Sequence, residues 1–162
     1  MRSLAGRRLG VVLAVAVAGA PFLLAADAKP AKEKEAPARD FDGKVVRLAP
    51  LLEKFGAKLD ADEAASWLAL QADDGKVYPL IKDDGSRLFY LDKRLLDRPM
   101  RLTGRLHPQS QMLQVVAVHS VIKGQLHEVY YWCEVCSIRM SEKKACVCCG
   151  GPTELREVPV KK

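Results

Sequence analysis

The chain has 162 residues, and 26 Lys and Arg residues against 20 Asp and Glu residues give it a formal net charge of +6. This excess is mild, so charge alone does not indicate a nucleic-acid or membrane partner. The length accommodates one domain with an appendage, and the five cysteines require a metal, disulfide or redox interpretation.

The first 28 residues have the pattern of a secretory signal peptide. Three arginines precede an apolar run over residues 9–26, and Ala26-Asp27-Ala28 offers a small-x-small cleavage site. An uncleaved anchor is the alternative, but the run is shorter than the ~20 residues that span a bilayer and contains the helix breaker Pro21. We therefore expect an exported protein, periplasmic or secreted, with no membrane span after cleavage. The pattern leaves the general secretory and twin-arginine routes open.

Residues 29–40 and 41–125 differ sharply in composition. The first segment contains only Lys, Glu, Ala, Pro, Arg and Asp, which cannot build a core, so it predicts a disordered linker. From Phe41 onward, short apolar runs rich in Val, Leu and Tyr alternate with turn signals, which is typical of a mainly β domain. We expect strands over 43–52, 66–71, 76–81, 86–91, 100–106, 112–122 and 125–132, and short helices over 60–67 and 91–98.

Two Asp-Asp-Gly segments, 73–75 and 83–85, separate apolar runs and predict β-hairpins, because glycine tolerates the positive φ of such turns. The paired aspartates are also candidate metal ligands or catalytic carboxylates, but turn chemistry already explains them. Gly104, inside a predicted strand, indicates a bulge or sharp bend.

Residues 98–118, "RPMRLTGRLHPQSQMLQVVAV", resemble the late strand pair of an OB-fold. The resemblance implies a small OB-like β-barrel over 41–125, a fold that binds oligonucleotides or sugars on one face. Aromatic and basic side chains that would suit single-stranded nucleic acid are present, but strands enrich aromatics in any case, and we interpret them as packing residues. These residues are Trp67, Tyr78, Phe89 and Tyr90, beside Lys76, Lys82 and Arg87.

All five cysteines lie between Tyr130 and Glu157. Cys133 and Cys136 form one C-x-x-C pair, and after nine residues Cys146 and Cys149 form another. Two intervening residues let a tight turn aim both sulfurs at one ion, and the arm between the pairs returns the chain as a hairpin. Gly150 follows the second pair, where an unusual backbone angle is easily adopted by glycine.

This arrangement resembles a zinc ribbon or a rubredoxin-type pair of knuckles over residues 126–157, followed by a tail over 158–162. The resemblance implies one zinc ion bound by Cys133, Cys136, Cys146 and Cys149. Cys148 departs from the pattern and leaves open whether it or Cys149 is the fourth ligand.

Other interpretations of the cysteines differ in how well they fit. "WCEVC" echoes the thioredoxin motif, but too few residues follow it for that fold, and covalent haem would need a histidine at Ser137 or Gly150. Disulfide or redox use remains open because exported cysteines oxidise and C-x-x-C is also a redox spacing, and a labile metal is a third possibility. The histidines His107, His119 and His127 are weaker ligand candidates.

No nucleophile–base pair, phosphate-binding loop or pair of catalytic carboxylates emerges from the sequence. We therefore predict a non-enzymatic, exported zinc protein that binds an unidentified protein or small ligand, or acts as a scaffold. One alternative is a thiol-redox or metal-handling protein that uses Cys148. A second is a nucleic-acid-binding module. The export signal argues against it. So does the charge balance, because Glu134 and Glu142 offset the basic residues Arg139, Lys143 and Lys144.

Cleavage of the signal peptide is directly testable. We expect the protein isolated from its native compartment to begin near Lys29, because the cleavage site ends at Ala28. Intact-mass spectrometry measures this. A mass that still includes residues 1–28 would show that the segment is an anchor or has no export role.

Overall fold

The computed structural model describes residues 36–60, 62 and 66–161. The predicted signal peptide, residues 29–35 of the predicted linker, and residues 61 and 63–65 of the predicted helix at 60–67 lie outside these residues. In the described part of the chain, no helix is long and apolar enough to cross a membrane.

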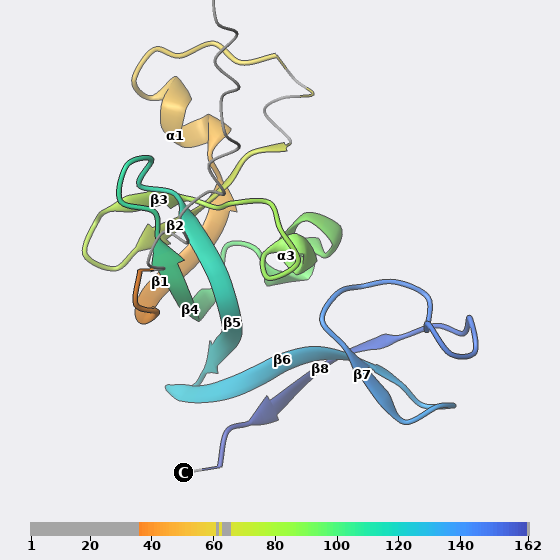
Figure 1. Ribbon diagram of the computed structural model, residues 1–162. Coiled ribbons are helices and arrows are strands. Elements are labelled where there is room, and N and C mark those ends of the chain that lie inside the picture. The colour runs from red at the N-terminus through yellow and green to blue at the C-terminus, as the bar shows by residue number, and fades with distance from the viewer. Residues whose placement is uncertain (1–35, 61, 63–65, 162) are drawn as a thin grey trace, which may run out of the picture. The chain divides into compact units, whose positions relative to one another are not determined.

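Strand β1 (Arg39–Arg47) lies in the middle of the N-terminal part of the sheet (Figure 1). It pairs antiparallel with β2 (Leu68–Ala72) on one edge and with β4 (Pro99–Leu106) on the other. β2 continues through the turn at residues 73–75 into β3 (Val77–Pro79), with Gly75 at φ 85°, so this predicted hairpin is confirmed. β1 begins two residues inside the predicted linker.

The next hairpin joins β4 to β5 (Leu113–Ile122), as predicted. Its register shifts between Thr103 and Gly104, which confirms the expected bulge. A side chain at Gly104 would bring its Cβ within 2.5 Å of the Gln114 carbonyl oxygen, so the close approach of the two strands explains the glycine.

The predicted barrel is not confirmed, since the strands within the described residues form an open antiparallel sheet. The pairing path runs β3-β2-β1-β4-β5-β6-β7, with β8 paired to β6. β3 is short, and the segment after it meets β5 in one isolated parallel bridge between Leu80 and Leu113. Beyond the bridge, a loop covers β5: Gln114 Nε2 donates to Asp83 Oδ2 (3.2 Å), and a Cβ on Gly85 would collide with the Val115 carbonyl oxygen.

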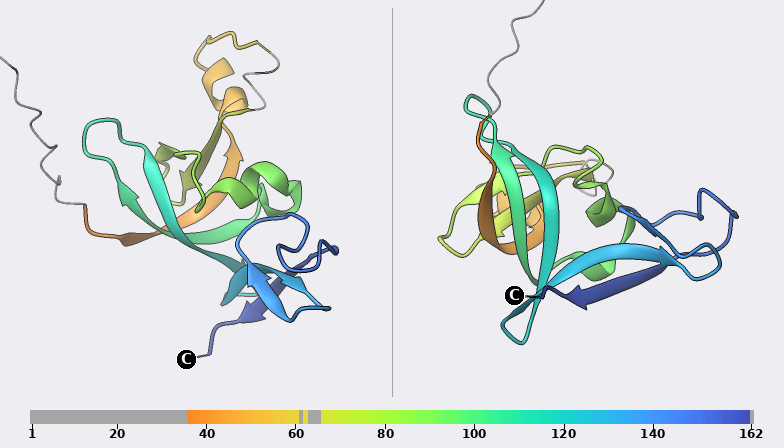
Figure 2. Two further views of the ribbon diagram at one scale, coloured as in Figure 1. Left: turned by 45° about the vertical axis from the view of Figure 1, so that its right-hand side comes forward. Right: turned by 60° about the horizontal axis from the view of Figure 1, so that its bottom comes forward.

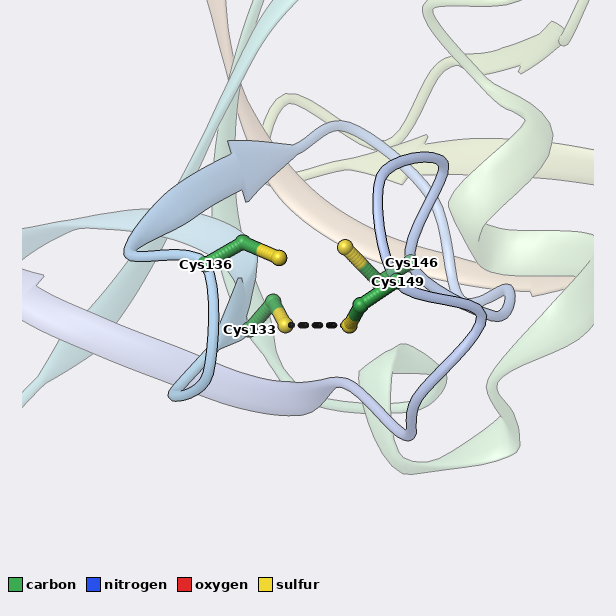
Figure 3. Close-up of side chains that lie close together, drawn as sticks. All are labelled: Cys133, Cys136, Cys146 and Cys149. Atoms are coloured by element: carbon green, nitrogen blue, oxygen red, sulfur yellow. Dashed lines mark hydrogen bonds between the residues drawn. The ribbon is translucent and has the colours of Figure 1, made fainter.

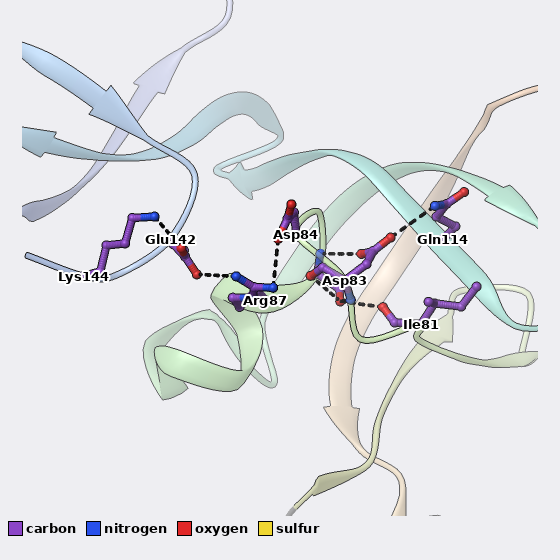
Figure 4. Close-up of polar contacts among 8 residues, drawn as sticks. Ile81, Asp83, Asp84, Arg87, Gln114, Glu142 and Lys144 are labelled. Carbon is purple, nitrogen blue, oxygen red and sulfur yellow. Dashed lines mark hydrogen bonds and ion pairs between the residues drawn. The ribbon is translucent and has the colours of Figure 1, made fainter. Parts of the chain in front are cut away.

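The predicted strand at 86–91 is wrong, because this segment forms helix α3 (Arg87–Leu91). The second Asp-Asp-Gly therefore does not make a hairpin. Asp83 and Ser86 exchange backbone-to-side-chain hydrogen bonds, and the buried Ser86 hydroxyl donates to the Ile81 carbonyl at 2.6 Å (Figure 4). These bonds turn the chain so that the Arg87 amide donates to the Asp83 carbonyl, which begins a helical turn.

Two other predicted elements are shorter in the structure than the sequence predicts. The strand expected over 43–52 stops at Arg47, and Ala49–Glu53 forms helix α1, with Pro50 in its first turn, where proline is tolerated. The helix expected over 91–98 is reduced to the single 3-10 turn η1 (Lys93–Leu95), which begins when the Asp92 carboxylate accepts from the Arg94 amide.

The C-terminal part consists of β6 (Gln125–Cys133), β7 (Ile138–Met140) and β8 (Glu154–Pro159). β6 pairs first with β5 and then with β7 along one edge, while β8 covers its other edge (Figure 2). Tyr131 lies opposite both Met140 and Leu155, and all three pack against the core of the N-terminal strands. The core cluster contains Phe41, Val45, Leu68, Leu70, Ala72, Tyr78, Leu80, Leu88, Phe89, Leu95, Met100, Leu102, Leu113, Val115, Tyr131 and Met140.

A buried polar contact fixes β6 to the N-terminal part. The fully buried Tyr131 donates its hydroxyl proton to Asp92 Oδ2 at 2.9 Å. The Arg94 guanidinium, through hydrogen bonds to the same carboxylate, lowers the pKa of Asp92 to about 2. Asp92 therefore stays ionised and paired, and its contribution to stability is lost only in acid, as pH falls from about 4 toward 2.

Removal of the Tyr131 hydroxyl tests how much the Tyr131–Asp92 hydrogen bond contributes to stability. We expect Tyr131→Phe to lower the free energy of unfolding by about 1–3 kcal/mol, because a buried carboxylate loses one donor. Urea unfolding measures the change. The matched control is Tyr130→Phe, on the opposite face of β6, with an expected effect within about 0.5 kcal/mol. Equal losses in the two variants would contradict a special role for the Tyr131–Asp92 bond.

Candidate metal centre

The first C-x-x-C pair is positioned by two strands. β6 ends at Cys133, the chain turns over residues 134–137, and β7 begins at Ile138, opposite Cys133. The Ser137 amide donates to the Cys133 carbonyl at 2.8 Å, and Ser137 adopts a left-handed φ of 52°. The turn therefore brings Cys136 back toward Cys133.

The second pair lies in the loop between β7 and β8 and repeats this geometry. The Gly150 amide donates to the Cys146 carbonyl at 2.8 Å, and Gly150 has φ 71°. Gly150 and Ser137 both stand four residues after the first cysteine of their pair, so the two turns are built alike. The expected role of Gly150 is confirmed, whereas nothing in the sequence marks Ser137 as its counterpart.

These two turns bring four sulfur atoms together (Figure 3). The Sγ atoms of Cys133, Cys136, Cys146 and Cys149 all lie within 4.8 Å of one another, the one such group among the residues described. Cys133 Sγ and Cys149 Sγ are 3.6 Å apart. Cys133 and Cys146 are buried and Cys149 is exposed, so the group sits at the surface with one closed and one open side.

The spacing of the sulfurs fits one tetrahedral metal ion. Zn–S bonds of about 2.3 Å in a regular tetrahedron require sulfur–sulfur separations of about 3.8 Å. The observed separations bracket this value, and all five cysteines are free thiols rather than disulfides. Four soft thiolates select zinc or iron over harder cations such as magnesium or calcium.

The backbone prepares one of these thiols to ionise. Amide groups of Cys149 and Cys148 donate to the Cys146 sulfur and lower the pKa of Cys146 to about 6; the Cys148 amide lies 3.4 Å away. The opposite knuckle behaves differently, because the neighbouring thiols, Cys148 first and then Cys149, raise the pKa of Cys136. A cluster of thiols that share protons in this way becomes fully ionised only when a cation replaces the protons.

The remaining candidate ligands do not join the group. Cys148 is exposed and lies outside the set of four, and none of the three histidines belongs to it. His127 Nδ1 instead lies 3.0 Å from the Gln125 carbonyl oxygen. The aspartates of the two Asp-Asp-Gly segments serve as turn and loop residues, with Asp74 bonded to Lys76 and Asp83 bonded to Ser86.

Four basic residues near the centre are paired with carboxylates. Arg139 stacks over Tyr130 at 4.3 Å and is bonded to Glu128, and Arg156 stacks over Trp132 and is bonded to Glu134. On the loop after β7, Glu142 accepts from Lys144 and forms an ion pair with Arg87 of α3 (Figure 4). Charge is thus balanced locally over this surface.

The predicted packing roles of the aromatic residues are confirmed for some of them and not for Trp67. Tyr78 and Phe89 are buried, whereas Trp67 is 51% exposed. Trp67 borders an apolar hollow of about 410 Å³ that Lys82, Tyr90 and Met112 also line. The size falls within the range of small-ligand sites.

Fold and site together define a mainly β protein with a zinc-ribbon-like cluster of four cysteines. Comparison of the chain with protein-family models, curated proteins and solved structures finds no match.

The equivalent positions Ser137 and Gly150 predict opposite responses to substitution. Gly150→Ala should cost about 1 kcal/mol in the unfolding of the metal-loaded protein, because a Cβ disfavours this φ although it meets no atom within 4 Å. Ser137→Gly should be neutral or stabilising by less than about 1 kcal/mol, since relief of the same strain is offset by entropy of the unfolded chain. Denaturant unfolding checks both. A larger loss for Ser137→Gly than for Gly150→Ala would contradict the equivalence.

Proposed function

We propose that the chain is an exported, non-enzymatic binding or scaffolding protein whose C-terminal ribbon holds one zinc ion through Cys133, Cys136, Cys146 and Cys149. The single observation that carries the metal site is the convergence of four sulfurs within 4.8 Å from two turns of the same construction. Cys149 is the fourth ligand in this proposal, since its sulfur lies beside Cys133 and that of Cys148 lies outside the group.

A structural role for the metal follows from the ligand set. Four thiolates complete the tetrahedron and leave no position for water or substrate, unlike a catalytic zinc site, which keeps one position open. The metal would join the loop between β7 and β8 to the end of β6. Its contribution is therefore to fold the ribbon rather than to perform chemistry.

The N-terminal strands supply the binding surface in this proposal. The order β3-β2-β1-β4-β5, with the parallel bridge from Leu80 to Leu113, supports an OB-like arrangement of these strands. The hollow beside Trp67 supports a ligand that is apolar or aromatic. On the C-terminal ribbon, the pairing of Arg139 and Arg156 with glutamates argues against a nucleic-acid partner, which needs unpaired cations along its backbone.

Export is supported by the pattern of the first 28 residues. Metal binding also suits such a compartment, because a thiolate held by zinc is less available for oxidation than a free one.

Substitution of single cysteines tests the metal site. Replacing any one of Cys133, Cys136, Cys146 or Cys149 by Ser should abolish stoichiometric zinc, because a structural zinc site gains ~10–16 kcal/mol in coupled binding and folding. Cys148→Ser is the matched control and should retain one zinc per chain. Elemental analysis of each purified variant gives the metal and its stoichiometry.

Three results would overturn the assignment. Loss of zinc in Cys148→Ser with retention in Cys149→Ser would exchange the fourth ligand. Iron in place of zinc would make the site rubredoxin-like. A native protein with two disulfides, one thiol and no metal would favour the redox alternative.

A further inference from the structure

The hollow beside Trp67 combines an apolar lining with a single cation. The buried residues Leu48, Leu68 and Leu80 contribute to this lining, and Trp67 borders the hollow with about half of its surface exposed. Among the described residues that line the hollow, Lys82 alone carries a charge. A cavity of this composition suits a ligand that is mostly apolar and carries one negative group.

The ammonium group of Lys82 has no carboxylate partner within the part of the chain that the structure describes. The two aspartates that follow it in the sequence are engaged elsewhere. Asp83 accepts a hydrogen bond from Gln114 Nε2 at 3.2 Å. Asp84 forms an ion pair with Arg87 at 2.9 Å (Figure 4). Lys82 is therefore available to an anion in the hollow, unlike the paired basic residues near the metal centre.

The ring of Tyr90 lies beside this cation. Lys82 Nζ is 4.9 Å from the centre of the ring, within the range of a cation–π contact. Burial raises the pKa of the Tyr90 phenol, so the phenol stays uncharged at neutral pH and does not neutralise the ammonium group. Tyr90 and Trp67 thus offer aromatic surface in the same hollow as the cation.

We propose that the hollow binds a small aromatic carboxylate, with its ring beside Trp67 and Tyr90 and its carboxylate on the Lys82 ammonium group. This inference rests on the proposed binding role of the N-terminal strands and specifies their ligand. One cation balances one carboxylate, whereas phosphate groups carry more charge and are typically bound by arginine or by several backbone amides. An aromatic ring also gains stacking contacts with Trp67 that an alkyl chain does not.

Calorimetric titration of the full chain, as purified, compares three probes: 2-naphthoate, its uncharged analogue 2-naphthamide, and decanoate. We expect 2-naphthoate to bind with a dissociation constant below about 1 mM and at least about threefold more tightly than the other two. Two-dimensional NMR locates the bound probe. The indole N–H signal of Trp67 should shift, and that of Trp132 on the ribbon should not.

Variants separate the charge from the aromatic surface. Lys82→Met keeps the apolar stem, so it should weaken 2-naphthoate about fivefold, as expected for an exposed ion pair, and leave 2-naphthamide unchanged. Lys143→Met removes an equal charge from an exposed position of the ribbon and should bind like the wild type. Trp67→Ala should weaken both naphthyl probes at least about threefold. Phe55→Ala, at an exposed aromatic residue outside the hollow, should weaken neither.

Equal affinities for 2-naphthoate and 2-naphthamide, or equal affinities of Lys82→Met and Lys143→Met for 2-naphthoate, would overturn the carboxylate but leave an apolar binding surface in place. Tighter binding of decanoate than of 2-naphthoate would overturn the aromatic ring in favour of a fatty acid. Absence of binding by all three probes, or a shift at Trp132 rather than Trp67, would refute both this inference and the hollow as a binding surface. The zinc site would be unaffected by that result, because metal analysis tests it separately.

Discussion

Strand β6 is part of both the N-terminal sheet and the C-terminal ribbon, and the position of the candidate metal centre depends on this double role. Its first residues pair with β5, its last residues pair with β7, and β8 pairs with residues 127–132 along the other edge. Tyr131 is fully buried between these parts, and its hydroxyl is bonded to Asp92. Cys133 follows two residues later on the same face of the strand, so the core of the N-terminal strands positions the first thiol. The ribbon has no separate core.

Because β6 is shared in this way, a bound metal would stabilise some parts of the ribbon more than others. A structural zinc ion contributes ~10–16 kcal/mol in isolated finger peptides, which is comparable with the net stability of a whole domain. Here β6, β7 and β8 already bury Tyr131, Met140 and Leu155 against the core. The loop over residues 141–153 contains no strand and carries Cys146 and Cys149. A bound metal would therefore contribute most to this loop, by tying it to the end of β6.

Features that depend on neighbouring residues were predicted correctly, and features that depend on contacts with other parts of the chain were not. The C-x-x-C spacing and Gly150 are local, and the sulfurs converge as expected. The first Asp-Asp-Gly forms a hairpin, but the same three residues at 83–85 lead into α3, because Ser86 bonds to Ile81 and the loop at Gly85 packs on Val115 of β5. The contact of Gly85 with Val115 joins distant parts of the chain and leaves no mark in the sequence around the turn.

The geometry of the second knuckle also accounts for the position of the fifth thiol. In each knuckle, the residues between the two cysteines direct their amides toward the first sulfur, and their side chains therefore point outward, as Val135 and Cys148 both do. Only the amide at this position serves the cluster, so the side chain there can differ between the two turns: it is valine in the first and cysteine in the second.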